Sequence, residues 1–309
     1  MKIWIYLIHC LHNNPDTMSN RQRRDLCFMN NIIDADFMKE FRKISTCMYH
    51  HNWHEKNGGN MSLLLSESEI RPYLSADRVI RTLPLPTAIP EMAGEILLIT
   101  GTGKYMKNIA DNPEENLGII RVSHDGSNCG LLWGFNTGGT FTSEIIMHLG
   151  AHYQRRFIDR NQRVVMHAHP AHIIALTHIH SLDEKEFSKA LWKTCTECIA
   201  IFPDGVGVLP WMVSSTANIG LVSAEKFKET NVVIWAMHGI TVTGSSLDEA
   251  YGILETVDKA AQIYLETYGK KKVNTITDAC LKQLVDTFHL KIKEGYLNEE
   301  GDRQNGSYA

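Results

Sequence analysis

The stretch Arg163-Val164-Val165-Met166-His167-Ala168-His169-Pro170 predicts a buried strand that ends in two histidines. Its apolar, β-branched run favours a strand in the interior of a sheet, and Pro170 stops the strand. Residues two apart on a strand point to the same side, so His167 and His169 should project their imidazoles together. The pattern predicts a pair of adjacent imidazoles at the end of a core strand.

A second apolar run, 232–236, leads into Met237-His238-Gly239, where the glycine lets the chain turn away. Three imidazoles without a fourth protein ligand are typical of a catalytic zinc site, which keeps one position open for substrate. His167, His169 and His238 are therefore the predicted ligands of one Zn²⁺. A core histidine that only packs is the competing interpretation for each of them, and the His-x-His pair favours the metal.

Segments on either side of these strands alternate between helical and extended patterns. The predicted helices cover 34–56, 142–156, 171–179, 183–196, 216–229, 246–268 and 277–290, and further strands are predicted at 61–65, 95–100, 117–123, 130–135 and 198–202. Residues 66–93, rich in proline and polar groups, are expected to form a long surface loop. The order predicts an α/β fold: one domain with a mainly antiparallel or mixed sheet covered by helices on both faces.

The predicted domain spans 34–293. Residues 1–33 are expected to be an extension that is disordered or precedes the true start, near Met18, Met29 or Met38. Residues 294–309 form a predicted polar tail.

Composition excludes several classes of function. A net charge of −4 provides no basic field for nucleic acid, and no run reaches the ~20 apolar residues that a membrane helix requires. The 7 cysteines are scattered and odd in number, which favours reduced thiols in a cytoplasm over a secreted disulfide framework. The expected partner is a small molecule.

Three short segments are suited to an anion. Backbone N–H groups of Gly58-Gly59-Asn60 and Gly101-Thr102-Gly103, and the hydroxyls of Thr142-Ser143 at a helix start, could surround a phosphate. Each is, taken alone, more often an ordinary turn or cap.

Two glutamates are candidates for proton transfer. Glu144 follows the Thr-Ser pair in a first helical turn, where a nearby cation and partial burial would tune its pKa. Glu197 lies between Cys195 and Cys198. Complementing the helix dipole is the competing role for Glu144, and a solvated helix end is the competing interpretation of Glu197.

In order, these motifs resemble those of bacterial rhamnulose-1-phosphate aldolases, which are class II aldolases. The resemblance covers roughly 36–292 and rests on this set: Asn57-Gly58-Gly59-Asn60, Thr100-Gly101-Thr102-Gly103-Lys104, Thr142-Ser143-Glu144, His167-Ala168-His169, the run from Thr196-Glu197-Cys198 to Phe202-Pro203-Asp204-Gly205-Val206-Gly207, Leu209-Pro210-Trp211-Met212 and His238-Gly239. The histidine motifs are shared by aldolases and epimerases of this fold, whereas the 202–212 motifs are more specific to the rhamnulose enzymes.

The resemblance implies zinc-dependent, reversible cleavage of L-rhamnulose 1-phosphate in rhamnose catabolism, with Glu144 as acid/base. It also implies a cytoplasmic homotetramer in which Glu197 assists proton transfer in a neighbouring subunit. The phosphate would be surrounded by Asn57, Gly59, Asn60, Gly101, Thr102, Gly103, Thr142 and Ser143.

Three alternatives remain at this stage. The nearest is another enzyme of the fold, either a fuculose-phosphate-type aldolase or a pentulose-phosphate 4-epimerase. A non-catalytic metal-binding protein like the adducin head would be expected to lose the histidines or the glutamate. A redox protein built on Cys195 and Cys198 would keep its activity after chelation.

Overall fold

The computed structural model describes residues 30–297, and its centre is one sheet in the order β2-β5-β4-β3-β1-β6-β9-β8-β7. The strands are β1 (Asn60–Leu65), β2 (Arg81–Pro84), β3 (Ile96–Thr100), β4 (Leu117–Val122), β5 (Asn128–Gly134), β6 (Val164–Ala168), β7 (Gly207–Leu209), β8 (Val232–Trp235) and β9 (Gly239–Gly244). Every pair is antiparallel except β7 with β8. The predicted mixed, mainly antiparallel sheet is confirmed.

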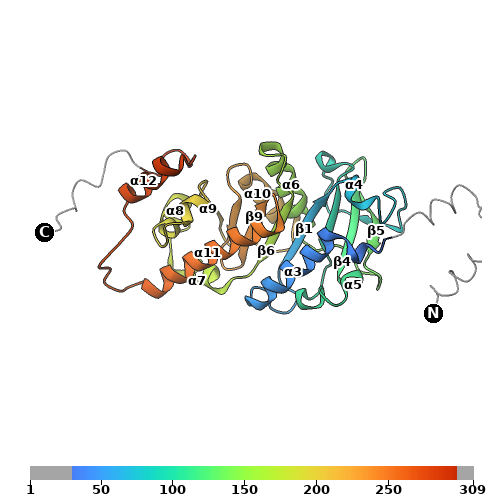
Figure 1. The fold of residues 1–309 in the computed structure, drawn as a ribbon, viewed down its shortest axis with the longest axis horizontal. Coiled ribbons are helices and arrows are strands. Elements are labelled where there is room, and N and C mark those ends of the chain that lie inside the picture. The colour runs from blue at the N-terminus through green and yellow to red at the C-terminus, as the bar shows by residue number, and fades with distance from the viewer. Residues whose placement is uncertain (1–29, 298–309) are drawn as a thin grey trace, which may run out of the picture.

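Helices cover both faces of this sheet. They are α3 (Asp36–His50), α4 (Glu67–Ile70), α5 (Pro113–Asn116), α6 (Ile145–Ile158), α7 (Ala171–Ile179), α8 (Glu184–Trp192), α9 (Cys198–Ile201), α10 (Ala217–Lys226), α11 (Leu247–Thr267) and α12 (Asp278–Phe288), with the 3₁₀ turns η2 (Ile32–Asp34), η3 (Pro90–Met92) and η4 (Met106–Asn108). In Figure 1 the sheet follows the long axis, with β5 and β4 to the right, β6 and β9 near the centre, and α12 at the far left.

Strand β6 shows how the two faces are divided. Val164, Met166 and Ala168 pack into the core cluster that contains α3, α7 and α11, whereas Val165 packs with α6 and α10 on the opposite face. This alternation is the period of two expected for a strand. His167 therefore projects on the same side as Val165, towards α6, and this places it beside the start of that helix.

One predicted strand is wrong, because residues 198–202 form the helical turn α9 instead. Cys198, Ile199 and Phe202 are buried while Ala200 and Ile201 are exposed, which is a helical spacing of apolar residues and not a run buried on both sides. The first helix was also predicted too long: α3 ends at His50, where the chain turns.

Strands β2, β7 and β9 were not predicted. In β9 the run Ile240-Thr241-Val242-Thr243 is β-branched throughout, a pattern that favours a strand. The predicted loop 66–93 contains α4, β2 and η3.

Ile32 is buried in the core, ahead of the predicted domain start. The domain boundaries themselves remain predictions, and residues 1–29 and 298–309 lie outside the described part of the chain. Between residues 30 and 297, no helix is both long enough and apolar enough to cross a bilayer.

Candidate metal centre

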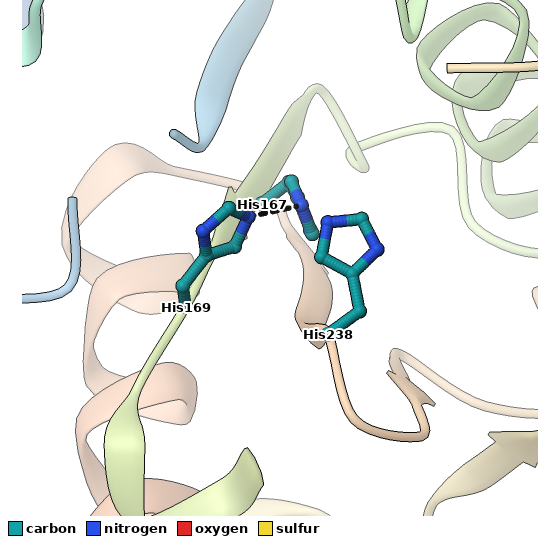
Figure 2. Close-up of side chains that lie close together, drawn as sticks. All are labelled: His167, His169 and His238. Atoms are coloured by element: carbon teal, nitrogen blue, oxygen red, sulfur yellow. Dashed lines mark hydrogen bonds between the residues drawn. The ribbon is translucent and has the colours of Figure 1, made fainter. Parts of the chain in front are cut away.

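His167 is the next-to-last residue of β6, and His169 follows the strand directly. The Nε2 atoms of the two rings are 3.1 Å apart, and Figure 2 shows that both rings approach the ring of His238. One nitrogen from each histidine can be chosen so that all three lie within 4.8 Å of one another. The structure thus brings the three predicted ligands together.

A tight turn between β8 and β9 delivers His238. Met237 within this turn has a φ of 57°, and its N–H donates to the hydroxyl of Thr177 at 2.9 Å, which anchors the turn on α7. A Cβ at Gly239 would lie 2.3 Å from the carbonyl oxygen of Ala168, so only glycine lets β9 begin this close to the end of β6. The turn therefore holds His238 against the His-x-His pair.

Hydrogen bonds at Nδ1 fix the tautomers of His167 and His169. His167 Nδ1 donates to the carbonyl of Ile240 at 3.0 Å, and His169 Nδ1 lies 2.7 Å from a carboxylate oxygen of Glu55. Each Nδ1 therefore carries the proton, and each Nε2 presents a lone pair. Two lone pairs that face each other at 3.1 Å repel unless a cation lies between them, so the donor set fits a metal ion.

Burial keeps His167 and His238 neutral. Burial, with repulsion from neighbouring His169 and His238 when they are charged, lowers the pKa of His167 well below its ordinary value. Burial first, and the charge of His169 second, lower the pKa of His238 to about 4. Neutral imidazole is the form that binds metal, so the site is suited to a cation at neutral pH.

Glu144 lies at the start of α6, on the side of the sheet that His167 faces. Its side chain is buried, and one carboxylate oxygen is 3.6 Å from His167 Nε2 and accepts from the amide of Asn60 at 2.8 Å. Burial raises the pKa of Glu144, and the Asn60 hydrogen bond opposes that rise. A carboxyl group with a raised pKa beside a metal centre can both take and release a proton.

Two of the predicted anion-binding segments are paired. Thr142 N–H donates to Thr100 at 2.9 Å and Thr102 N–H to Thr140 at 2.9 Å, so 100–102 and 140–142 run side by side. Thr100 Oγ1 in turn accepts from the N–H of Met61 at 3.1 Å, next to Asn60. The two segments therefore meet beside Glu144.

The third segment packs on the histidines. A Cβ at Gly58 would lie 2.8 Å from the ring of His169, and one at Gly59 would lie 2.8 Å from the carbonyl oxygen of His167. Asn60 is buried, whereas Asn57 is exposed. At the edge of the site, Ser143 is exposed and donates to the hydroxyl of Ser215 at 2.9 Å.

Glu197 is not brought to the histidines within this chain. It precedes α9, is exposed, and accepts from the thiol of Cys195 at 2.7 Å. Cys195 and Cys198 are not joined to each other in a disulfide, and burial raises the pKa of Cys198 to about 12. A thiol so reluctant to ionise is a poor redox nucleophile.

Sequence reasoning missed Glu55, which orients His169, and the buried residues Ser62, His148 and His152. The spacing of Glu144, His148 and His152, four residues apart on one helix face, was the available signal.

A three-histidine cluster beside a buried carboxylate, on a helix-covered and mainly antiparallel sheet, is the arrangement of a catalytic metal site with a proton carrier beside it. The family model described as class II aldolase and adducin N-terminal domain matches residues 39–265. The chain belongs to this class II aldolase and adducin family.

Most of this chain is similar to proteins named rhamnulose-1-phosphate aldolase. The rhamnulose-1-phosphate aldolase of Listeria innocua is 44% identical over 268 residues, which cover 86% of this chain and 98% of that protein. The protein of the same name from Yersinia pseudotuberculosis is 38% identical, and the alignment covers 79% of this chain and 91% of that protein. In fold, a sugar-phosphate aldolase from Thermotoga maritima superposes with a TM-score of 0.65 at 24% identity, covering 76% of this chain and 97% of that one.

Proposed function

We propose that this protein catalyses the reversible cleavage of L-rhamnulose 1-phosphate to dihydroxyacetone phosphate and L-lactaldehyde, with one Zn²⁺ per subunit. The observation that carries the proposal is the buried carboxylate of Glu144, 3.6 Å from His167 in the three-histidine cluster. It is supported by 44% identity to proteins named rhamnulose-1-phosphate aldolase.

His167, His169 and His238 would hold the metal, and three imidazoles suit zinc. When bound, Zn²⁺ would supply Lewis acidity that withdraws electron density from the substrate's oxygens. Glu55 holds the ring of His169, and the Ile240 carbonyl holds that of His167, so the lone pairs stay aimed at one point.

The cleavage needs two proton movements and no oxidant. As the C3–C4 bond breaks, the C4 hydroxyl loses its proton and becomes the aldehyde oxygen, while the electron pair remains with C3. That carbon then gains a proton to give dihydroxyacetone phosphate. Glu144 is the group assigned to C3, because it is buried beside the cluster and its raised pKa favours carrying a proton.

The substrate's phosphate would be bound by the three predicted anion-binding segments: Asn57, Gly59 and Asn60; Gly101, Thr102 and Gly103; Thr142 and Ser143. Backbone N–H groups and hydroxyls supply hydrogen bonds to an anion, and the start of α6 adds a favourable dipole. Anchoring the phosphate there would place the bond to be broken beside Glu144 and the histidines.

Glu197 would act in a second subunit. Its exposure leaves the carboxylate free to enter a neighbouring site in a homotetramer, where it would assist proton transfer at the C4 hydroxyl. The proposed setting is L-rhamnose catabolism in the cytoplasm.

Product analysis tests the substrate assignment. L-rhamnulose 1-phosphate and L-fuculose 1-phosphate should be offered separately to the zinc-loaded enzyme, with coupled detection of dihydroxyacetone phosphate and chromatography of sugar phosphates. Faster release from the rhamnulose substrate is expected. Preference for the fuculose substrate would reassign the aldolase, an isomer without triose phosphate would indicate an epimerase, and no product from either would favour a binding protein.

A further inference from the structure

Helix α6 carries two buried histidines that the proposed reaction does not use. His148 and His152 lie four and eight residues beyond Glu144 and are 0% and 2% exposed. Both are on the same helix face as Glu144 and meet β1 of the sheet. Such side chains are retained in a core only with hydrogen-bond partners.

Those partners form one continuous chain. His152 Nε2 is 2.8 Å from Ser62 Oγ, which is 2.7 Å from His148 Nδ1. His148 Nε2 is 2.6 Å from Asn60 Oδ1, and Asn60 Nδ2 is 2.8 Å from the Glu144 carboxylate. This chain of hydrogen bonds thus leads from His152, in the middle of α6, to Glu144, the proposed acid/base.

When Glu144 is ionised, only one arrangement of protons gives every hydrogen bond of this chain one donor and one acceptor. A carboxylate only accepts, so Asn60 turns its NH₂ group to Glu144 and its oxygen to His148. His148 must then donate from Nε2. Complete burial lowers the pKa of His148 to about 3, so the ring is neutral and its Nδ1 accepts.

The remaining links follow by the same logic. Since His148 Nδ1 accepts, the Ser62 hydroxyl donates to it, and Ser62 Oγ is left to accept from Nε2–H of His152. Every donor therefore points towards Glu144. If Asn60 turned its amide over, its oxygen would face the carboxylate and its NH₂ group would face a donor, which costs two buried hydrogen bonds.

We propose that His148 is a positioning residue which, together with Ser62 and His152, locks the amide of Asn60 so that its NH₂ group faces Glu144. The catalytic part of this inference rests on the proposed function, whereas the tautomers do not. Two experiments separate these parts.

The first experiment reads the tautomers without any substrate. Long-range ¹H–¹⁵N spectra of the full-length protein with ¹⁵N-labelled histidine, assigned through His148→Gln and His152→Gln, report which ring nitrogen carries the proton. Both residues are expected as neutral rings protonated on Nε2. A proton on Nδ1 of His148, or a charged ring at neutral pH, would overturn the proposal even if the enzyme is fully active.

The second experiment compares variants by turnover per zinc-loaded subunit. Gln places a nitrogen the same number of bonds from Cα as His Nε2, so His148→Gln keeps a donor for Asn60, whereas His148→Leu removes it. We expect His148→Leu to lower kcat by about 10- to 100-fold, and His148→Gln to restore most of it. Equal losses in the two variants would overturn the proposal.

A double mutant tests whether the effect passes through Asn60. Residues that act through one group are not additive, so His148→Leu should cost nothing further in an Asn60→Ala background. Additive losses would overturn the proposal. Ser62→Ala should resemble His148→Leu, while Ser45→Ala, whose buried hydroxyl bonds only within α3, should leave turnover unchanged. An inactive parent protein would defeat the proposed function and leave the tautomer experiment to decide the positioning role.

Discussion

Removing the carboxylate of Glu55 should weaken metal binding without touching a metal ligand. Its oxygen accepts from His169 Nδ1 at 2.7 Å, a charge-assisted hydrogen bond that holds the ring with its Nε2 lone pair towards His167. Glu55→Ala leaves His169 free to rotate and to change tautomer. Loss of such an orienting partner typically lowers metal affinity about 10- to 100-fold.

Because Glu55 is exposed, we expect a loss of metal affinity at the lower end of that range. Its side chain is 68% exposed, so water screens its charge and replaces part of the hydrogen bond. We expect about a tenfold weaker affinity for zinc in Glu55→Ala, which is about 1.4 kcal/mol. Glu55→Gln keeps an acceptor oxygen and should lose less.

The assay is competition for Zn²⁺ between the apoprotein and a chromophoric chelator of known affinity, at neutral pH. Glu91→Ala, at an exposed glutamate on η3, is the matched control. Unchanged affinity in Glu55→Ala would refute the role of Glu55 in orienting His169. A loss of similar size in Glu91→Ala would show that the effect is not specific to the site.

Three further predictions concern the proton carrier, the glycine loop and acid stability. Glu144→Gln should retain zinc but lose about 10²- to 10⁴-fold in kcat, measured by triose phosphate release; wild-type turnover would remove Glu144 from the mechanism. Gly59→Ala, with φ at 71° and a Cβ 2.1 Å from the ring of His54, should lose activity and about 1–3 kcal/mol of stability. Gly94→Ala, with φ at 80° and nothing within 4 Å, carries the same backbone strain without the clash; equal losses of stability in urea unfolding would rule the clash out. The pKa of His148 is about 3 in the folded state, below its unfolded value of about 6.5. The unfolded state therefore binds a proton at His148 more readily than the folded state does. The contribution of His148 to folding stability is complete above pH ~6.5 and is lost as pH falls. Unfolding free energy should therefore fall by about 2 kcal/mol from this group between pH ~7.5 and pH ~5, and His148→Gln should remove that part of the slope.

Much of the architecture was predictable because its signals are local. The run 164–168 begins with two β-branched valines and ends two residues before Pro170, so β6 and the two histidines at its end could be placed from sequence. Helix α7 matches its predicted range of 171–179, for a similar reason: Pro170 defines its start. Residues 198–202 were mispredicted because a short apolar run fits a buried strand and a buried helical turn equally well.

The candidate site was predictable where its residues follow one another in the chain, and not where the fold joins distant ones. The pair His167 and His169 needs only the period of a strand. Glu55 reaches His169, and Ser62 reaches His148, across 114 and 86 positions of sequence, so their roles depend on the pairing of β1 with β6 and on how α6 packs. The role proposed for Glu197 would require a second subunit, so that role stays a prediction.

Metal-dependent cleavage is tested most directly by measuring dihydroxyacetone phosphate release from L-rhamnulose 1-phosphate before EDTA, after EDTA, and during stepwise return of zinc. We predict rapid release by the loaded protein, loss after chelation, and recovery in proportion to bound zinc up to one ion per subunit, with no recovery in His169→Ala. Release that continues after complete removal of metal would contradict the account, as would a protein that binds zinc at the three histidines and releases nothing.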